Sequence, residues 1–438
     1  MKRDQVLFVA QFAHACNCVW DDEQNAVPMK KRRRFNMLLL GQGGSGKTAV
    51  IQEIVLPAMD FLFPPDPTDG GNPVLIVCAK WSQAENISTD THKAVSCHRA
   101  AYMGIGTHRN SAMLPQDQKG ALERTWSHLR LLVIEEVSMV SPNLYNMLLY
   151  RSFHGRRDRW EVAEHEYDKL TGAFGRMPLV IHLGDFLQLK PTGGSGLSLL
   201  SNLRELSTKS DVQIPSEHQM GMKLFCKTPL CFELLETNRF KDQGLRDLMA
   251  FMRNPRSSIP PTMRANWKRM QLRAADPRLR EERFQEGYII AIFWDTVARC
   301  MLQRATRDAR ALDQVLYLLQ AADTSKPLMP RTLAAKLANA VNPSKTGGLH
   351  GMLPLHIGMH VRFLQHIDLA KGLVKDAEGT VVHVEINPED ADEVESARRD
   401  GRPAYLRHVP LGVWLRMAKY RGAAFADRLQ GGCAGHEP

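Results

Sequence analysis

The segment that most constrains the fold is residues 41–48, which reads GQGGSGKT and directly follows the apolar run at residues 37–40. It matches the pattern G-x-x-x-x-G-K-[ST], in which glycines let the backbone bend so that successive N–H groups face phosphate oxygens. The pattern needs a strand before it and a helix after it, and both neighbouring segments suit those roles. A glycine-rich turn without chemical consequence is the alternative. The predicted phosphate contacts come from Gly41, Gly43, Gly44, Ser45, Gly46, Lys47 and Thr48.

Two side chains of this loop have separate predicted roles. Lys47 neutralises the β and γ phosphate oxygens, and the Thr48 hydroxyl ligates a magnesium ion. The sequence therefore predicts a binding site for a magnesium-bound nucleoside triphosphate.

Short apolar runs recur along the chain and are separated by longer helical stretches. Buried strands that alternate with helices predict a mostly parallel sheet covered on both faces, because parallel neighbours need crossover connections. We expect an α/β protein whose ligands gather at the carboxyl ends of its strands. The expected strands are residues 37–40, 74–78, 131–134, 179–183 and 288–293.

The chain has 438 residues, a formal net charge of +10 and eight cysteines. A basic balance favours a polyanionic partner such as nucleic acid. None of the cysteines forms the C-x-x-C pairs that are typical of a zinc site, so we expect reduced thiols in an intracellular protein. No apolar run is long enough to cross a bilayer, and we expect no membrane partner.

A second half of the phosphate site is expected where residues 131–134 lead into Glu135 and Glu136. Magnesium and an attacking water both require carboxylates at the end of a buried strand. We assign Glu135 to the magnesium shell and Glu136 to the orientation and deprotonation of the water. A surface acidic pair at the end of a strand is the alternative.

Two further segments carry a family resemblance. Residues 134–140 read IEEVSMV, and residues 183–189 read LGDFLQL. Together with residues 41–48 they resemble motifs I, II and III of superfamily-one DNA helicases of the PIF type, which are relatives of RecD. The resemblance implies a P-loop NTPase with a RecA-like parallel sheet domain, a second RecA-like domain and a small SH3-like β-barrel insert.

What the family does is implied in the same way. Its members use ATP and Mg²⁺ to move 5′ to 3′ along single-stranded DNA and to separate duplexes at junctions. They serve genome maintenance, including repair, recombination and telomere upkeep, in the nucleus or mitochondrion of eukaryotes. Gln188 would sense the γ-phosphate, and Arg239 in the segment ETNRF would stabilise transition-state charge as an arginine finger does.

Weaker matches add three residues to the expected site. Gln5 resembles the family's adenine-reading glutamine, whose amide can donate and accept hydrogen bonds at once. Thr91 and His92 resemble the motif that contacts the DNA strand, although a Thr-His pair can equally cap a helix. The arginines between motifs II and III, namely Arg151, Arg156, Arg157 and Arg159, form either a second phosphate-contacting surface or a solvated charged loop.

We expect the domains to span residues 1–225 (RecA-like, ATP-binding), 226–345 (partial second RecA-like domain), 346–390 (SH3-like insert) and 391–438 (incomplete C-terminal segment). Residues 360–363 and 380–384 alternate in the way that a small β-barrel requires.

The chain also departs from the family. Glu135 stands where the family has aspartate, and the added methylene moves the carboxylate outward by roughly an ångström. Motifs V and VI, which follow the barrel insert in the family, have no counterpart here. The chain is either a fragment of a longer protein or a degenerate relative. The alternative function is therefore a protein that binds ATP and single-stranded DNA without unwinding.

Overall fold

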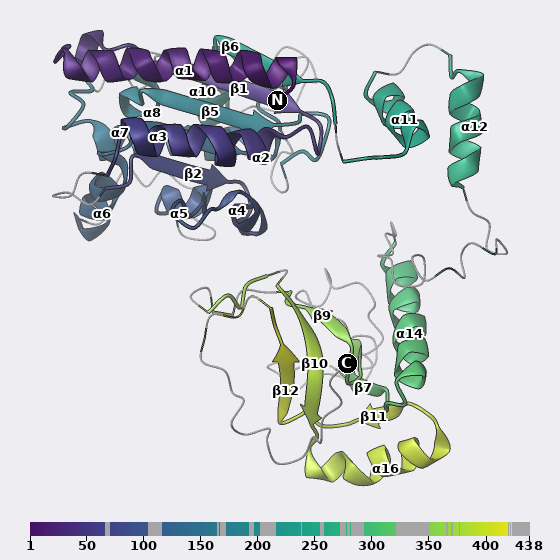
Figure 1. Ribbon diagram of the computed structural model, residues 1–438. Coiled ribbons are helices and arrows are strands. Elements are labelled where there is room, and N and C mark those ends of the chain that lie inside the picture. Colours follow the sequence, from purple (N-terminus) through teal and green to yellow (C-terminus); the bar gives the residue numbers. More distant parts are fainter. Residues whose placement is uncertain are drawn as a thin grey trace. The chain divides into compact units, whose positions relative to one another are not determined.

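The computed structural model describes residues 1–65, 71–103, 116–163, 166, 172–191, 197–201, 216–237, 239–254, 258–271, 277, 281, 293–320, 351–364, 367–368, 371–375, 377–418, 420 and 422. The chain divides into two compact units, Met1–Gln271 and Leu272–Pro438 (Figure 1). No helix within these described ranges has both the length and the apolar character that a membrane span requires.

A six-stranded sheet forms the centre of the first unit, with strand order β3-β2-β4-β5-β1-β6. All five neighbouring pairs are parallel, as the alternation of strands and helices predicts. The strands are β1 (Phe35–Gly41), β2 (Val74–Cys78), β3 (Val95–Ser96), β4 (Leu131–Glu135), β5 (Leu179–Gly184) and β6 (Leu230–Leu234).

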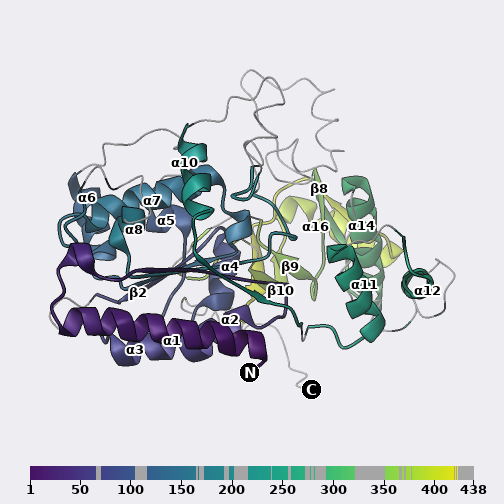
Figure 2. The ribbon, with the colours of Figure 1, turned by 90° about the horizontal axis from the view of Figure 1, so that it is seen from above.

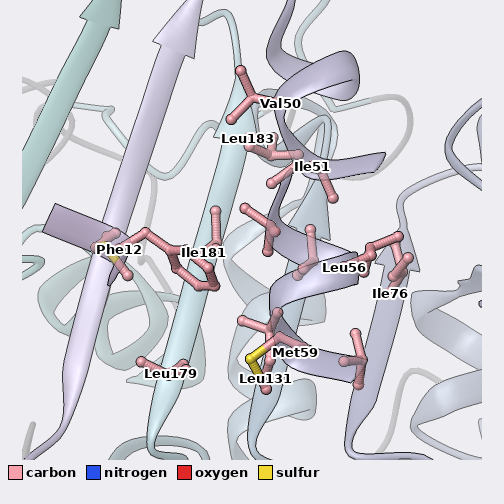
Figure 3. Packing of buried hydrophobic residues seen from close by; sticks show 14 of the residues in the cluster. Phe12, Val50, Ile51, Leu56, Met59, Ile76, Leu131, Leu179, Ile181 and Leu183 are labelled. Carbon is pink, nitrogen blue, oxygen red and sulfur yellow. The ribbon is translucent and has the colours of Figure 1, made fainter. Parts of the chain in front are cut away.

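Helices cover both faces of this sheet, and Figure 2 shows the two helical layers on either side of it. Successive side chains of a strand point to opposite faces. In β1, accordingly, Met37 and Leu39 join one apolar core whereas Leu38 joins the other. The first core packs against α1 (Arg3–Gln24), the π-helical turn η2 (Ile51–Val55) and α3 (Leu56–Leu62), as Figure 3 shows in part. The second packs mainly against α5 (Cys97–Ala100), α6 (Gln116–Trp126), α7 (Pro142–Arg156) and α10 (Ser216–Phe225).

Helix α1 is amphipathic and packs its apolar face against the sheet. Its fully buried side chains include Phe8, Phe12 and Ala15, and the same face continues to Val19. These spacings place the apolar side chains on one stripe of a helix with 3.6 residues per turn. The stripe holds α1 against the sheet, with the Phe8 ring edge-on to Phe232 of β6 at 5.5 Å.

The remaining elements of the first unit are mostly short. They are η1 (Met29–Lys31), α2 (Lys47–Val50), α4 (Trp81–Ile87), η3 (Val137–Met139), α8 (Ala173–Arg176), α11 (Gln243–Arg253) and α12 (Pro261–Met270). Helix α2 starts inside the GQGGSGKT segment, so that this segment joins a strand to a helix as its pattern requires.

The second unit contains two three-stranded sheets. One has the order β11-β7-β8 and the other β12-β10-β9, the latter fully antiparallel. Val381, Val394 and Leu406 belong to one core shared by both sheets and α16. The elements are α14 (Trp294–Ala311), β7 (Tyr317–Gln320), β8 (Met352–Leu355), β9 (His360–Arg362), β10 (Glu378–Glu385), η8 (Pro388–Asp390), α16 (Ala391–Asp400), β11 (Ala404–Leu406) and β12 (Gly412–Arg416).

The boundaries differ from the expected ones in two places. Strand β6 pairs with β1, so the first sheet extends beyond residue 225. Strands β11 and β12 come from residues 391–438 and pair with β7 and β10, which means that this segment completes both sheets of the second unit. The strand expected at residues 288–293 lies outside the described residues except for Phe293. That the second unit contains an SH3-like barrel stays a prediction.

The arginines between motifs II and III also lie differently from either expectation. Arg151 and Arg156 are in helix α7 and are buried, with 2% and 0% of their surfaces exposed. The Arg156 guanidinium donates to the carbonyls of Trp126, Leu129 and Gly175. This pair is therefore part of the interior, and Arg157 and Arg159 alone are exposed.

Two methionines test how the first core is stabilised. Met59 in α3 is fully buried, whereas Met252 in α11 is 60% exposed. Met59→Ala should lower the free energy of unfolding by about 2–4 kcal/mol, because it removes apolar contacts and leaves a cavity. Met252→Ala should change it by less than about 0.5 kcal/mol. Urea unfolding of both variants measures the difference, and equal losses would contradict this description of the core.

Candidate functional site

Parallel pairing brings the ends of four strands to one edge of the sheet. Leu40 of β1 is opposite Gly184 of β5, and Gly41 is opposite Leu234 of β6. Glu135 closes β4 beside Cys78 of β2. The segments after β1, β4, β5 and β6 therefore meet in one place, although they are far apart in sequence.

The phosphate-binding loop turns through two glycines with positive φ, Gly44 at +81° and Gly46 at +91°. Lys47 is 8% exposed, and its ammonium group donates to the Gly41 carbonyl at 2.5 Å and the Gln42 carbonyl at 3.4 Å. Burial lowers the pKa of Lys47, and the nearby carboxylates of Glu135 and Glu136 oppose this shift. The loop thus holds a desolvated cation that lies near three carboxylates and near the guanidinium of Arg239.

Both expected carboxylates lie at this edge. Glu135 is 7% exposed, and burial, followed by the charge of Glu136, raises the pKa of Glu135 to about 7, while Lys47 opposes the rise. Glu136 has a left-handed backbone, with φ 51° and ψ 49°, which turns the chain sharply after β4. Burial also raises the pKa of Glu136, against the opposing charge of Lys47. The surface-pair alternative is wrong for Glu135, which is buried.

Three buried oxygen atoms at this edge make no hydrogen bond in the described part of the chain, namely Ser45 Oγ, Glu135 Oε2 and Ser138 Oγ. A buried polar atom without a partner costs about 1–3 kcal/mol, so such atoms cluster where a ligand completes them. Hydroxyl and carboxylate oxygens are the ligands that Mg²⁺ and its waters accept. These residues therefore fit a magnesium–phosphate group.

The segment after β6 covers the loop from the other side. Thr237 Oγ1 donates to the Gly43 carbonyl at 2.8 Å. A Cβ atom added to Gly43 would lie 2.7 Å from Arg239 Nη1, and one added to Gly44 would lie 2.3 Å from Arg239 Cβ. The structure thus places Arg239 directly against the loop, and both glycines are needed for this close approach. Sequence reasoning found Arg239 but missed Thr237.

Gln188 approaches the same loop from the end of β5. Its Nε2 lies 3.7 Å from the Cβ position of Gly43 and donates to Asp185 Oδ2 at 2.9 Å. Arg253 of α11 donates to both oxygens of Asp185, at 2.7 and 3.0 Å. Burial alone would raise the pKa of Asp185, but these hydrogen bonds outweigh it and hold the pKa below its ordinary value. Asp185 is in the LGDFLQL segment, but its partner Arg253 carried no sequence signal.

Gln5 lies beside the loop as expected. Its Nε2 donates to the Ser45 carbonyl at 3.3 Å and lies 2.6 Å from the Cβ position of Gly46, while its Oε1 accepts from the Lys2 amide. The side chain therefore reaches the start of helix α2. Its expected role in reading adenine stays a prediction.

The two expected DNA contacts do not share one environment. Thr91 is exposed, whereas His92 is 3% exposed and its ring pairs with Asp60 at 2.8 Å and Asn72 at 3.2 Å. A base cannot stack on a ring buried in this way. The capping alternative is wrong as well, because Ser96 caps the next helix, α5. His92 thus holds the segment before β3 in place.

Comparison with known proteins agrees with this arrangement. A family model described as an AAA domain matches residues 23–193, which include the phosphate loop, both glutamates and Gln188. ATP-dependent DNA helicase RRM3 of Saccharomyces cerevisiae is 26% identical over 172 residues, 39% of this chain and 20% of that protein. ATP-dependent DNA helicase PIF1 of Mus musculus is 24% identical over 373 residues, 83% of this chain and 46% of that protein. The chain is thus similar to PIF-type DNA helicases.

The first unit is a RecA-like P-loop domain. Its parallel sheet and its loop between β1 and α2 agree with this fold. Among solved structures, Pif1 helicase from Candida albicans has a TM-score of 0.49 and 20% identity, covering 91% of this chain and 72% of that one. The chain spans less than half the length of either of the curated relatives named above.

Glu135 makes stability depend on pH in a defined direction. Its pKa is about 7 in the folded chain and 4.5 ordinarily, so the folded state binds the proton more tightly. The stabilisation is present below pH 4.5 and is lost as pH rises through 7. Glu135→Gln should therefore gain stability relative to wild type between about pH 5 and 8, by on the order of 2–3 kcal/mol.

Urea unfolding at both pH values measures this gain. Glu53→Gln is the matched control, because Glu53 is exposed in η2. A Glu135→Gln gain that is the same at pH 5 and pH 8 would contradict the raised pKa.

Proposed function

We propose that this protein is an ATP-dependent DNA helicase of the PIF type. The observation that carries the proposal is the convergence of Arg239 and Gln188 on Gly43, in the loop that also holds Lys47. A phosphate loop alone serves many reactions. A loop contacted by a cation from beyond β6 and an amide from beyond β5 is equipped to respond to hydrolysis as well as to bind nucleotide.

In this proposal the residues divide the work of phosphoryl transfer. The loop amides and Lys47 bind the β and γ phosphates, and Thr48, Ser45 and Glu135 would hold a magnesium ion directly or through its waters. The ion, when bound, neutralises charge that develops on the phosphate oxygens.

Glu136 accepts the proton of the attacking water as the new P–O bond forms and the bond to the β-phosphate oxygen breaks. Its raised pKa strengthens it as a base. Arg239 stabilises the equatorial oxygens of the γ-phosphoryl group, and the Gln188 amide contacts that group and reports its departure. Gln5 recognises the adenine ring.

The proposed substrate is single-stranded DNA at duplex junctions, travelled 5′ to 3′, in repair, recombination or telomere upkeep. RRM3 and PIF1, the two relatives compared above, are both ATP-dependent DNA helicases. The net charge of +10 supports a polyanionic partner. Thr91, which is exposed beyond β2, stays a proposed strand contact, and we propose a nuclear or mitochondrial location if the source is a eukaryote.

A second candidate is a protein that binds ATP and single-stranded DNA without unwinding. It is favoured by Glu135, whose pKa of about 7 leaves much of the carboxyl protonated at neutral pH. A protonated carboxyl is a poor magnesium ligand, and a longer side chain displaces the ligating oxygen. Both effects weaken turnover more than nucleotide binding.

The helicase proposal predicts DNA-stimulated hydrolysis. Single-stranded DNA should raise ATP turnover severalfold, and Lys47→Ala should lower it by on the order of a hundredfold or more, because phosphate charge loses its main cation. Lys223→Ala, at an exposed lysine of α10, is the control and should match wild type. A coupled ATPase assay measures all three, and turnover that ignores DNA would count against a motor.

The second candidate yields its own prediction. Glu135→Asp should raise the rate of ATP turnover by about tenfold at neutral pH, since a shorter carboxylate restores ligand placement. If strand separation of a forked duplex remains undetectable in both wild type and this variant while ATP tightens strand binding, the non-unwinding reading is correct. Unwinding by the wild-type chain would exclude the second candidate. An unchanged ATP turnover in Glu135→Asp would show that Glu135 does not limit the rate.

A further inference from the structure

A group of arginines lies at the opposite edge of the first sheet, where the strands begin. Arg34 directly precedes β1 and Arg130 directly precedes β4, while Arg176 ends α8, shortly before β5. These three strands are neighbours in the order β4-β5-β1. The arginines are thus separated from the phosphate loop by the length of β1, about 20 Å for a strand of this size.

Three guanidinium groups of this region lie close to the Trp160 ring. The guanidinium carbons of Arg156, Arg130 and Arg32 lie 4.3, 4.9 and 5.9 Å from the ring centroid. Each contact is worth about 0.5–2 kcal/mol, depending on desolvation. A narrow pocket opens beside the ring and is lined by Arg32, Arg34, Arg176 and Glu23, among others. We name it the arginine pocket.

Among the described residues, positive charge exceeds negative charge around this pocket. Five guanidiniums, those of Arg32, Arg34, Arg130, Arg156 and Arg176, face two carboxylates, Glu23 and Glu166. A third acid on the rim, Asp22, is bound bidentately by Arg33. Arg159, which is exposed, adds further positive charge. Unbalanced buried charge costs several kcal/mol unless a counter-ion offsets it.

Arg34 forms no ion pair within the described residues. Its Nη1 is buried and makes no hydrogen bond within the described residues. Burial, and next the positive charge of Arg176, lower the pKa of Arg34, and Glu166 offsets this only in part. Arginine carries five donors and stays charged in proteins, so a guanidinium in this setting is suited to an external acceptor.

The backbone beside the pocket is strained. Phe174, Gly175 and Arg176 follow one another with φ values of 51°, 61° and 57°. The left-handed conformation costs roughly 1–2 kcal/mol for each non-glycine residue. This turn holds Arg176, which is 3% exposed, so that it donates to the Trp160 carbonyl and pairs with Glu166. Its Nε has no hydrogen-bond partner among the described residues. Strain of this kind is typical of ligand-binding segments.

We propose that the arginine pocket binds a phosphate-type oxyanion, at a site separate from the nucleotide loop. A phosphate group carries between one and two negative charges, which match the local surplus, and its oxygens accept from the forked guanidinium. The pocket is narrow, so the oxyanion lies at its rim, where Arg34 is partly exposed. The site does not depend on the helicase proposal.

The test measures thermal unfolding of the full chain carrying Lys47→Ala, which weakens phosphate binding at the loop. Inorganic phosphate at constant ionic strength should raise the melting temperature by a few degrees, as preferential binding to the folded state requires. Arg34→Gln should remove this gain and weaken phosphate binding by about tenfold. Without phosphate, Arg34→Gln should be at least as stable as its parent, because the buried Arg34 Nη1 makes no hydrogen bond within the described residues.

Arg264→Gln, at an exposed arginine of α12 outside the pocket lining, is the control and should leave the melting temperature and its response to phosphate unchanged. Arg34→Lys should keep part of the gain. A parallel titration with a single-stranded oligonucleotide separates the two sources of phosphate: an Arg34-dependent affinity identifies a nucleic acid backbone, and an Arg34-independent one a free phosphate. The proposal is overturned if neither probe stabilises the chain in an Arg34-dependent way, or if Arg34→Gln lowers stability equally in both conditions.

Discussion

Parallel pairing of β1 with β5 and β6 is the interaction on which the rest of the first unit depends. It places Gly41, Gly184 and Leu234 at one edge and so gathers loops from residues 41–48, 185–188 and 237–239. Without this register the Thr237 hydroxyl could not reach the Gly43 carbonyl, and Arg239 could not lie against the loop. The positions of the site residues therefore depend on backbone hydrogen bonds between strands, although these bonds take no part in the proposed reaction.

The two edges of this sheet handle buried charge in different ways. At the carboxyl edge, Lys47 lies among acids whose pKa values are raised by burial, so opposite charges partly offset one another. At the amino edge, guanidiniums are stabilised by the Trp160 ring and by backbone carbonyls instead of by a matching number of carboxylates. Among the described residues, positive and negative charges partly offset one another at the carboxyl edge, whereas positive charges outnumber negative ones at the amino edge.

Local patterns in the sequence were enough to predict β1, β2, β4 and β5, the turn between β1 and α2 and the position of two carboxylates at the end of β4, because apolar runs and glycine spacing depend on near neighbours. They did not predict β3 or β6. They could not predict the bond of Thr237 to Gly43 or that of Arg253 to Asp185, which join residues 194 and 68 positions apart. Such contacts depend on strand order, which no local pattern contains. Arg156 was misjudged for a related reason: a charged residue is expected at the surface, and only the fold supplies the three carbonyls that bury it.

Strand β6 lies at the end of the described sheet and pairs with β1 alone, and four of its five residues are partly or largely exposed. Edge strands with few buried side chains open at lower free energy than central ones. The arginine that contacts the phosphate loop is thus attached to the part of the sheet that separates most readily. Its position can change by local opening of β6, while β1, β4 and β5 keep the loop and the carboxylates in place.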